Sequence, residues 1–304
     1  MRAEQVADQR QVGGVIGLVL AEPGAGRSAS RTNISGYLDY LRRAGLEYAA
    51  FQVCESDRTV LGAVLALRLP GRTTVLMLPP VGELGTTLAG QATVTSFATA
   101  TELARKPHYL QALVEPDCAA KRNVLLAAGF GELTRLQYLE MLTPAVAPNA
   151  RDAAWRPYGP TTGAEFELTV SRTYEGSMDC PELRELRPER DALASHRASG
   201  EFEPGLWELC ELGGAVAGCL LCAPLSRADA LEIVYMGVVP EQRGRGVARI
   251  LLERAAQHAT QRQLGRMLLV VDARNEPARR VYSRYGFRCV SVRDAFLCVP
   301  ARAD

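Results

Sequence analysis

The segment Glu241–Ala248 constrains the fold most strongly, because it joins two stretches with different patterns. Residues 231–239 are apolar and β-branched, as in a strand, whereas residues 247–263 have the spacing of a helix. Gly244 and Gly246 allow the turn between them backbone conformations that a side chain forbids. The first free N–H groups of such a helix point into the turn, at the positive end of the helix dipole. The pattern therefore predicts an α/β unit with an anion site at the turn.

Glycine spacing alone does not identify the anion. The turn lacks the third glycine of a dinucleotide-binding fold, and it lacks the Gly-Lys-Ser/Thr ending of a P-loop. An ordinary strand–helix turn with solvated arginines is compatible with the same residues. The turn taken together with the segments that follow it distinguishes an anion site from an ordinary turn.

Three segments follow one another in a specific order: residues 235–248, the apolar strand 267–272, and residues 275–287. Together they resemble the GNAT superfamily of N-acetyltransferases. The Arg/Gln-x-x-Gly-x-Gly/Ala signature of that family is matched by Arg243, Gly246 and Ala248. Its second signature is matched by Asn275, Ala278, Tyr282, Gly286 and Phe287. The match covers roughly the last third of the chain.

A weaker copy of the same pattern precedes it. Placing Gly129-Phe130 on Gly286-Phe287 gives an offset of 157 residues (287 − 130) and aligns an apolar strand and a short helix in each half. The fold class expected is α/β with a mixed sheet (α+β): two tandem GNAT-like domains, each a central twisted mixed β-sheet flanked by helices. The proline-bearing segment 143–150 is the expected linker, with domains at 1–145 and 146–304.

The functional positions do not repeat in the first half. Cys118 stands where the second half has Asn275, and Leu125 stands where it has Tyr282. We therefore expect residues 1–145 to form a degenerate, structural or substrate-shaping domain, in which weak binding of coenzyme A remains open. Residues 146–304 are expected to form the catalytic domain.

Composition excludes several classes of protein. The net charge is +1, with 35 basic and 34 acidic residues among 304, so we expect no nucleic-acid partner. No apolar run approaches the about 20 residues of a membrane helix, so we expect no membrane association. The eight cysteines lack framework spacing, which favours a reducing, cytoplasmic location. The pair Cys219 and Cys222 has C-x-x-C form but lies in an apolar run, so we expect core residues and no metal. A monomer or homodimer is expected.

By resemblance, the co-substrate is acetyl-CoA. Its pyrophosphate is expected at the backbone N–H groups of the turn, with the arginine side chains assisting. Val238 is expected to polarise the thioester through its N–H on a bulged strand, with Gly237 leaving room for the ligand. Asn275 is expected to contact the coenzyme, cap the following helix, or both. The expected coenzyme-binding residues are Met236, Gly237, Val238, Arg243, Gly244, Arg245, Gly246, Val247, Ala248 and Asn275.

Two side chains are expected to move protons. An even strand period would place Glu232 on one face with Val234, Met236 and Val238, so Glu232 is the candidate base for the amine. A solvated strand end is the alternative for Glu232. Tyr282 matches the acid of the family, and it is expected to protonate the departing thiolate. Tyr285 is the second candidate for that acid, and a plain core tyrosine is the alternative for Tyr282.

The expected reaction is direct transfer of an acetyl group to the primary amine of a small molecule or peptide. Intact Glu232, Asn275 and Tyr282 favour an enzyme over the alternative, a non-catalytic acyl-CoA-binding or sensing protein. No histidine stands in a nucleophile motif, so an acyl-enzyme is disfavoured. His196 and Trp207 are candidates to line the acceptor pocket.

Overall fold

The computed structural model describes residues 1–56, 59–148, 153–199, 201–225 and 228–301. The expected linker ends at residues 149 and 150, which lie outside this described part. Contacts between Cα atoms divide the chain into two compact units. Unit 1 consists of Met1–Leu133 and Arg293–Asp304, and unit 2 is Thr134–Val292.

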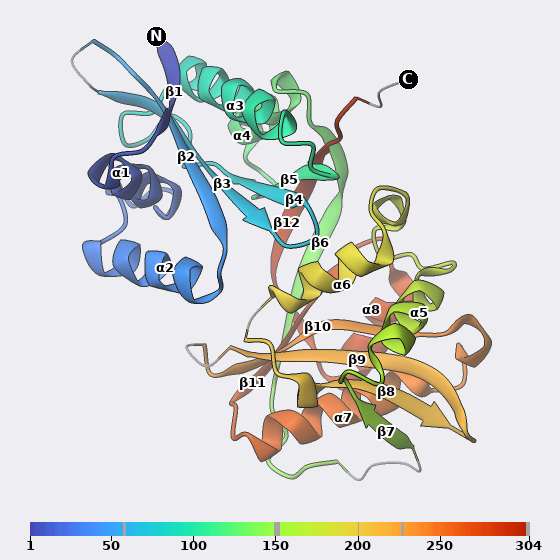
Figure 1. Ribbon diagram of the computed structural model, residues 1–304. Coiled ribbons are helices and arrows are strands. Elements are labelled where there is room, and N and C mark those ends of the chain that lie inside the picture. The colour runs from blue at the N-terminus through green and yellow to red at the C-terminus, as the bar shows by residue number, and fades with distance from the viewer. Residues whose placement is uncertain (57–58, 149–152, 200, 226–227, 302–304) are drawn as a thin grey trace. The chain divides into compact units, whose positions relative to one another are not determined.

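Unit 1 is a sheet covered by helices on both faces (Figure 1). Its strands run in the order β1-β2-β3-β4-β5-β12, with β4 and β5 parallel and the other pairs antiparallel. Phe51 and Val64 of the sheet pack with Val94 of α3 and Leu125 of α4. Its elements are β1 (Arg2–Val6), α1 (Gln9–Val19), α2 (Arg31–Arg43), β2 (Glu47–Cys54), β3 (Val60–Leu69), β4 (Thr73–Met77), α3 (Leu88–Leu103), β5 (Tyr109–Val114), α4 (Ala119–Ala127) and the end of β12 (Arg288–Cys298).

Unit 2 has strand order β6-β11-β10-β9-β8-β7, with β10 and β11 parallel and the other pairs antiparallel. Its elements are most of β6 (Gly131–Leu142), β7 (Ala154–Pro157), α5 (Gly163–Tyr174), η1 (Pro181–Glu185), α6 (Glu189–Arg197), η2 (Pro204–Leu206), β8 (Trp207–Leu212), β9 (Ala215–Leu225), β10 (Ala230–Val238), η4 (Pro240–Gln242), α7 (Val247–Gln261), β11 (Arg266–Asp272), α8 (Glu276–Tyr285) and the start of β12.

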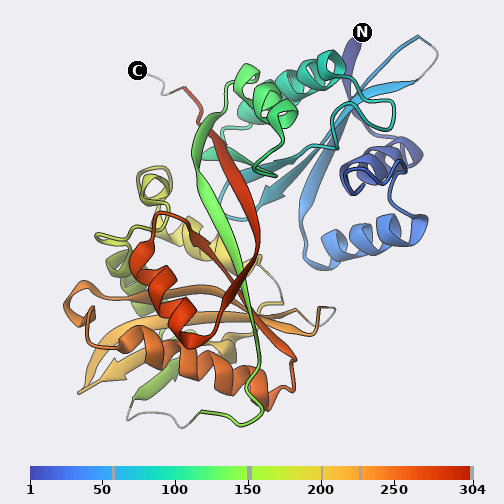
Figure 2. The same cartoon turned by 180° about the vertical axis from the view of Figure 1, so that it is seen from behind.

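Two apolar clusters cover opposite faces of the unit 2 sheet. Leu251 of α7 and Tyr282 of α8 pack with Leu231 and Ile233 of β10 on one face, which is seen from the side of these helices in Figure 2. Phe166 of α5 and residues of α6 and β8 form the cluster on the other face, seen in Figure 1. Alternate residues of β9 enter the two clusters, so Cys219 and Cys222 point to opposite faces. The prediction that they are core residues is confirmed.

The predicted repeat is present, and its offset is constant over several elements. The starts of β4 and β10, β5 and β11, α4 and α8, and β6 and β12 are each 157 residues apart (230 − 73, 266 − 109, 276 − 119 and 288 − 131). The parallel pair has the same register in both units, since Thr73 faces Tyr109 and Ala230 faces Arg266. The predicted mixed α/β class with two repeated units is therefore confirmed.

The last strand of each half lies in the sheet of the other unit. β6, at the end of the first half, pairs with β11 from Leu136↔Asp272 to Leu142↔Arg266. The end of β12 pairs with β5, with Asp294 opposite Val114. The compact units therefore break at Leu133 and Val292, whereas the sequence placed the division at residues 145/146. Sequence patterns identify a strand but not the strand with which it pairs. Here the pairing of β6 and β12 determines to which compact unit each part of these strands belongs.

Within the described residues, no helix is both long and apolar enough to cross a bilayer.

Candidate active site

The parallel strands β10 and β11 separate part of the way along unit 2. Their pairing runs from Ala230↔Arg266 to Ile233↔Leu269. A bulge at Val234 follows directly in β10, because the register with β9 shifts between Ile233 and Tyr235. Beyond this point β11 bonds to a loop instead, since the Asp272 N–H donates to the Asp179 carboxylate at 2.8 Å. The sheet therefore opens between two strands, with β10 still held by β9.

One amide of β10 points into this opening. Val238 lies opposite Gly218 of β9, and the Val239 N–H donates to the Ala217 carbonyl at 3.1 Å. This pattern makes Val238 and Gly218 a non-hydrogen-bonded antiparallel pair, so the N–H and C=O of Val238 both point away from β9. The Val238 N–H is thus directed to the side where β11 has separated.

The turn after β10 presents several further amides. Gly244 and Gly246 have φ values of 74° and 82°, in the region that favours glycine, and α7 begins at Val247. Within the described part of the chain, no hydrogen bond uses the N–H groups of Gly244 through Ala248. The Arg243 N–H is different, because it donates to the Pro240 carbonyl at 3.2 Å. Among the described residues, the run of unpaired backbone amides in this turn therefore starts at Gly244, and the Arg243 N–H is not part of it.

The two arginines of the turn differ in their contacts. The Arg243 side chain donates from Nε to the Val238 carbonyl at 3.2 Å and from one Nη to the Thr173 carbonyl at 2.9 Å. It thereby ties the end of α5 to the end of β10, and its guanidinium is engaged by the protein itself. Arg245 is exposed and has no ion pair or hydrogen bond to another described residue. Arg245 is therefore the arginine whose side chain is available to a phosphate.

The structure shows a packing requirement for glycine at position 237. A Cβ added there would lie 2.5 Å from the Thr173 Oγ1 of α5. Gly237 is buried where β10 packs against α5. The glycine is required so that α5 can approach the strand closely.

The bulge also changes the face of Glu232. Met236 and Val238 pack with the α7 cluster, together with Leu231 and Ile233. Glu232 alternates with Leu231 and Ile233, so it lies on the opposite face of the sheet. The expected even period over Glu232, Met236 and Val238 is therefore wrong, because the extra residue of the bulge reverses the alternation. Burial does raise the pKa of the Glu232 carboxyl, in the direction expected.

Three candidate site residues belong to α8: Asn275 at its N-cap, and Tyr282 and Tyr285 within the helix. Asn275 caps the helix, because its side chain accepts from the Ala278 N–H at 3.2 Å. Tyr282 is 8% exposed and packs edge-on against Phe287. Burial and then the charge of Asp179 raise the pKa of the Tyr282 phenol. Burial and then the charge of Glu253 raise the pKa of Tyr285 to about 12.

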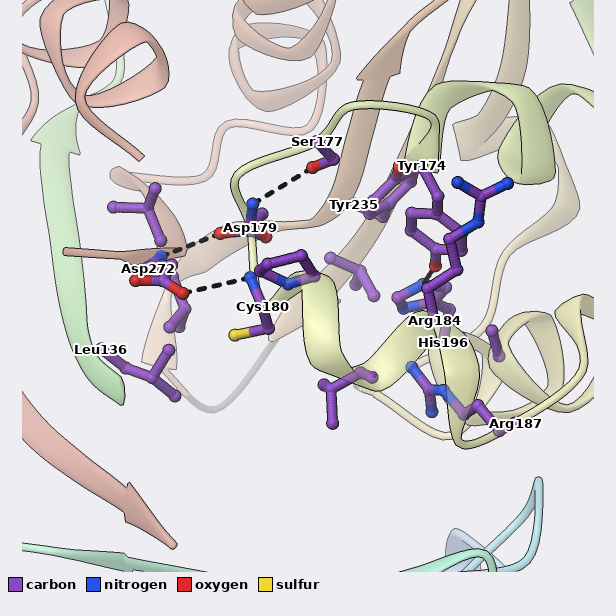
Figure 3. Close-up of a pocket in the computed structure, with 16 residues that line it drawn as sticks. Leu136, Tyr174, Ser177, Asp179, Cys180, Arg184, Arg187, His196, Tyr235 and Asp272 are labelled. Carbon is purple, nitrogen blue, oxygen red and sulfur yellow. Dashed lines mark hydrogen bonds between the residues drawn. The ribbon is translucent and has the colours of Figure 1, made fainter. Parts of the chain in front are cut away.

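A cavity of about 220 Å³ lies on the α5 and α6 face of the opened sheet (Figure 3). Val234 at the bulge, Tyr235, and Val270 and Asp272 of β11 contribute to its lining from the strands. The residues 174–187 and α6 supply most of the rest. The cavity is therefore smaller than typical small-molecule sites, whose volumes start at roughly 300 Å³.

Aromatic rings form one wall of the cavity. Tyr235 shares a 2.7 Å hydrogen bond with Thr173 and stacks on His196 at 5.1 Å between ring centroids. Tyr174 shares a 3.2 Å hydrogen bond with the His196 Nε2. Burial and then the charge of Arg187 lower the pKa of His196 to about 3, so this ring is neutral at physiological pH. Of the two candidates for the acceptor pocket, His196 lines this cavity, whereas Trp207 is fully buried in the α5 cluster and does not.

Two carboxyl groups form another wall. Although burial opposes ionisation, donors that include Arg274 and Thr134 hold the pKa of Asp272 at about 2. Burial and the adjacent charge of Asp272 raise the pKa of Asp179. Cys180 has a left-handed backbone (φ 46°) and donates its N–H to Asp272 at 3.1 Å. This strained residue fixes the loop against β11.

Sequence reasoning missed this loop as part of a site. Residues 175–181 contain a glycine, a serine and a proline, a composition that indicates a turn but no site. Their function in the site depends on Asp179 meeting Asp272, which lies 93 residues away. No local pattern could have indicated that contact.

Residues 157–287 match the family model described as Acetyltransferase (GNAT) family. Among the relatives found, the Mycothiol acetyltransferase of Thermobispora bispora is 30% identical over 173 residues, which cover 53% of this chain and 57% of that protein. The Mycothiol acetyltransferase of Streptomyces bingchenggensis is 36% identical over 86 residues, or 28% of each chain. The chain thus spans little more than half the length of the first relative.

Solved structures similar to this chain extend over nearly all of it. The GCN5-related N-acetyltransferase from Sphaerobacter thermophilus has a TM-score of 0.70 at 17% identity, covering 99% of this chain and 97% of that one. A tandem GNAT protein from the clavulanic acid biosynthesis pathway has a TM-score of 0.58 at 14% identity, covering 100% and 99%. At these identities the similarity describes the fold, and the repeat of two units is common to both comparisons.

Proposed function

We propose that this chain, whose residues 157–287 belong to the GNAT family of acetyltransferases, transfers the acetyl group of acetyl-CoA to a primary amine in unit 2. The observation that carries the proposal is the arrangement of backbone donors along one path. The Val238 N–H points into the opened sheet, and the unpaired amides of Gly244–Ala248 follow it at the start of α7. These donors suit a thioester carbonyl and a pyrophosphate, respectively.

In the proposed reaction, the amine nitrogen attacks the thioester carbon directly. Negative charge develops on the carbonyl oxygen, where the Val238 N–H stabilises it. The C–S bond then breaks, and the acetyl group remains on the amine while coenzyme A leaves as a thiolate. The amine gives up a proton, and the thiolate takes one up. The arrangement requires no covalent intermediate on the protein.

Tyr282 is the proposed donor to the thiolate. Its raised pKa keeps the phenol protonated at neutral pH, so the proton is present when it is needed. A phenol of raised pKa is nevertheless a weak acid toward a thiolate of pKa near roughly 8.5. We therefore propose a moderate contribution to the rate. The cap formed by Asn275 fixes the start of the helix that carries Tyr282.

Glu232 is the proposed base, acting from the cavity face of β10. Support comes from its raised pKa and from its position two residues before Val234, which lines the cavity. Glu232 is not itself a lining residue, so a water molecule would have to connect it to the amine.

The test is release of free thiol from acetyl-CoA in the presence of a panel of amines, with the product identified by mass. Because the named relatives are mycothiol acetyltransferases, their acceptor belongs in the panel. Amine-dependent thiol release with an acetylated product supports the proposal. Binding of acetyl-CoA without turnover across the panel would instead support an acyl-CoA-binding protein.

We also propose that the protein works in a reducing compartment such as the cytoplasm. Its eight cysteines are all free thiols in the structure.

A further inference from the structure

We propose that Asp179 binds the ammonium group of the acceptor in the unit 2 cavity and removes the proton that the nitrogen must lose before it attacks. This inference rests on the proposed function, because it assigns a further catalytic residue to the same reaction. An alkylamine in neutral water is mostly an ammonium ion, since the pKa of such a group is about 10. Its nitrogen therefore loses one proton before the attack and a second one after the C–N bond has formed. Asp179 takes the first proton, and Glu232, acting through water, takes the second.

Asp179 lies where the sheet has opened. The pairing of β10 and β11 ends at Ile233↔Leu269, and the bulge adds one residue to β10. Counting from that pair, three residues along β11 reach Asp272, and four along β10 reach Gly237. The Asp272 N–H donates to Asp179 at 2.8 Å and so points away from β6, toward β10 on the other side of β11. Asp179 is therefore held at the open edge of β11, level with Gly237.

Two reciprocal hydrogen bonds fix this carboxylate. The Asp272 N–H donates to Asp179, and the Cys180 N–H donates to the Asp272 carboxylate at 3.1 Å (Figure 3). The Asn275 side chain also donates to Asp179, while its oxygen caps α8 at the Ala278 N–H. A carboxylate that is held from β11 and α8 in this way does not have to reorganise when a ligand binds.

The lining of the cavity contains few groups that could act as a base. Among the described lining residues, the other carboxyl group is Asp272, and the one imidazole is His196. Although burial opposes ionisation, donors that include Arg274 hold the pKa of Asp272 at about 2, so this group stays ionised. Burial lowers the pKa of His196 to about 3, which makes it a weak base. Burial raises the pKa of Asp179, and this direction makes a carboxylate a stronger base near neutrality.

Among the described residues, no cation forms an ion pair with Asp179. Arg274, whose charge acts on Asp179, pairs with Asp272 at 2.7 Å and with Glu182 at 2.6 Å. Although the neighbouring walls desolvate its carboxyl, Asp179 as a whole stays accessible. An ammonium group would supply the missing positive charge and donate to the carboxylate.

The charge of Asp179 acts on both the proposed acid and the aromatic wall of the cavity. After burial, it is the next cause of the raised pKa of Tyr282, and it is a smaller cause of the raised pKa of Tyr235. Tyr282 belongs to the apolar cluster against which Val238 packs. The proposed base, the proposed acid and the Val238 N–H therefore lie around the last residues of β10.

Each proton of the reaction then has a destination. An N–H bond of the ammonium breaks as an O–H bond forms on Asp179, and the nitrogen keeps the electron pair with which it attacks the thioester carbon. After the attack, the second proton leaves the nitrogen for Glu232, and Tyr282 gives its proton to the thiolate. The proton on Glu232 replaces that of Tyr282, and the proton on Asp179 passes to solvent. One proton is released in each turnover.

The Asp272 N–H is a direct reporter of Asp179, because its hydrogen bond ends on that carboxylate. In the full-length protein with isotope-labelled aspartate, the NMR signal of this amide should titrate with a midpoint above about 3.9, the usual value for aspartate. Propylammonium chloride should lower this midpoint relative to sodium chloride of equal ionic strength, because a bound cation favours the ionised carboxylate. A midpoint that propylammonium does not move would overturn the inference.

Asp179→Asn should abolish this titration, and its unfolding temperature would show that the protein is folded. The asparagine keeps an oxygen that can accept from the Asp272 N–H. An Asp272 amide that still titrates in this variant with the same midpoint would show that another group is responsible and would count against the inference.

Turnover tests the removal of the proton. At pH about 7.5 propylamine is mostly an ammonium ion, whereas trifluoroethylamine, in which fluorine lowers the basicity of the nitrogen, is mostly neutral. Asp179→Asn should lower kcat/KM for propylamine by about 100-fold, and that for trifluoroethylamine by less than about threefold. Glu182→Gln is the matched control, because it removes a nearby carboxylate that does not line the cavity, and it should leave the ratio of the two amines unchanged. Equal losses for both amines in Asp179→Asn would overturn the inference.

The readouts separate this inference from the proposed function. Turnover of both amines that Asp179→Asn leaves unchanged would refute the role of Asp179 and leave the acetyltransferase in place. A protein whose Asp272 signal responds to propylammonium, but which acetylates no amine, would support ammonium binding at Asp179 and refute acetyl transfer.

Discussion

The turns that follow β4 in unit 1 and β10 in unit 2 occupy equivalent places, but their backbone donors differ. In unit 1, the Gly82 N–H donates to the Thr86 hydroxyl at 3.1 Å, and the Thr87 N–H donates to the Leu61 carbonyl at 2.8 Å. The Thr87 hydroxyl caps α3 at the Gly90 N–H. In unit 2, the amides of Gly244–Ala248 have no such partners among the described residues.

The strands that precede these two turns also differ, both in bulges and in the N–H groups that they carry. β4 has no register shift against β3, and Pro79-Pro80 follow it, so two N–H groups are missing from that stretch. β10 instead has the bulge at Val234 and continues to Val238. Both units open between their parallel strands. Among the described residues, the turn of unit 1 already uses the amides of Gly82, Thr86 and Thr87, whereas the turn of unit 2 leaves the whole run Gly244–Ala248 unpaired. The same fold thus differs between its two copies in how many amides of this turn are already bonded within the protein.

The largest effect is expected from removing β6, the last strand of the first half, which pairs with β11 in the sheet of unit 2. A fragment of residues 146–304 lacks β6, which leaves one edge of β11 unpaired and removes Leu139 from the α7 cluster. We expect no cooperative thermal unfolding of this fragment, in contrast to the full chain. A folded fragment that binds coenzyme A would show that the second half of the chain does not need β6.

The second largest effect is expected from changing the backbone conformation at Gly246, in the turn before α7 of unit 2. Val disfavours the φ of 82° at Gly246, so Gly246→Val should redirect the first amides of α7 and weaken coenzyme A binding by about 100-fold or more. Gly82→Val is the matched control, because Gly82 has a φ of 84° and nothing within 4 Å of an added Cβ. Calorimetry should show little change for that control. A similar loss in both variants would mean that the two turns bind coenzyme alike.

Tyr282→Phe should lower kcat by about 10- to 100-fold with coenzyme binding nearly unchanged, because in the proposed reaction the phenol gives its proton to the leaving thiolate. In unit 1, the equivalent residue is the fully buried Leu125, which has no proton to give. Tyr285→Phe is the control, and it should retain most activity. A normal rate for Tyr282→Phe would remove this group from the mechanism.

Arg243→Gln should lower kcat by roughly tenfold, because the guanidinium holds the Val238 carbonyl and the end of α5. Arg245→Gln should instead weaken coenzyme binding, since its side chain is exposed and without a protein partner among the described residues. Steady-state kinetics and direct binding distinguish the two. The reverse result would return the phosphate-binding role to Arg243.

The smallest effect is expected on stability. Asp272 has a pKa of about 2, below the usual value of about 3.9, so its contribution is present above pH about 4 and is lost as pH falls toward 2. Asp272→Asn should therefore cost about 2 kcal/mol at neutral pH. Glu115, 157 residues earlier, is 39% exposed in its bridge to Lys121, so Glu115→Gln should cost less. Urea unfolding at pH 7 and pH 3 measures both, and the difference should shrink at pH 3.

The strand–turn–helix around Gly246, the repeat offset of 157 residues and the GNAT resemblance could be read from the sequence, because each depends on residues close together in the chain. The buried C-x-x-C pair could also be placed from local alternation alone. The face of Glu232 could not, because one extra residue at Val234 reverses every later position of the strand.

The amino-acid sequence by itself determined the elements, their repetition and the position of the glycine-containing turn before α7. The tertiary structure decided which strand completes each sheet, that the Arg243 side chain is bonded to the Thr173 carbonyl, and that Asp179 meets Asp272 beside a cavity. The physical reason is that hydrogen bonds and charge pairs between distant residues depend on the packing of whole elements, which local periodicity does not contain.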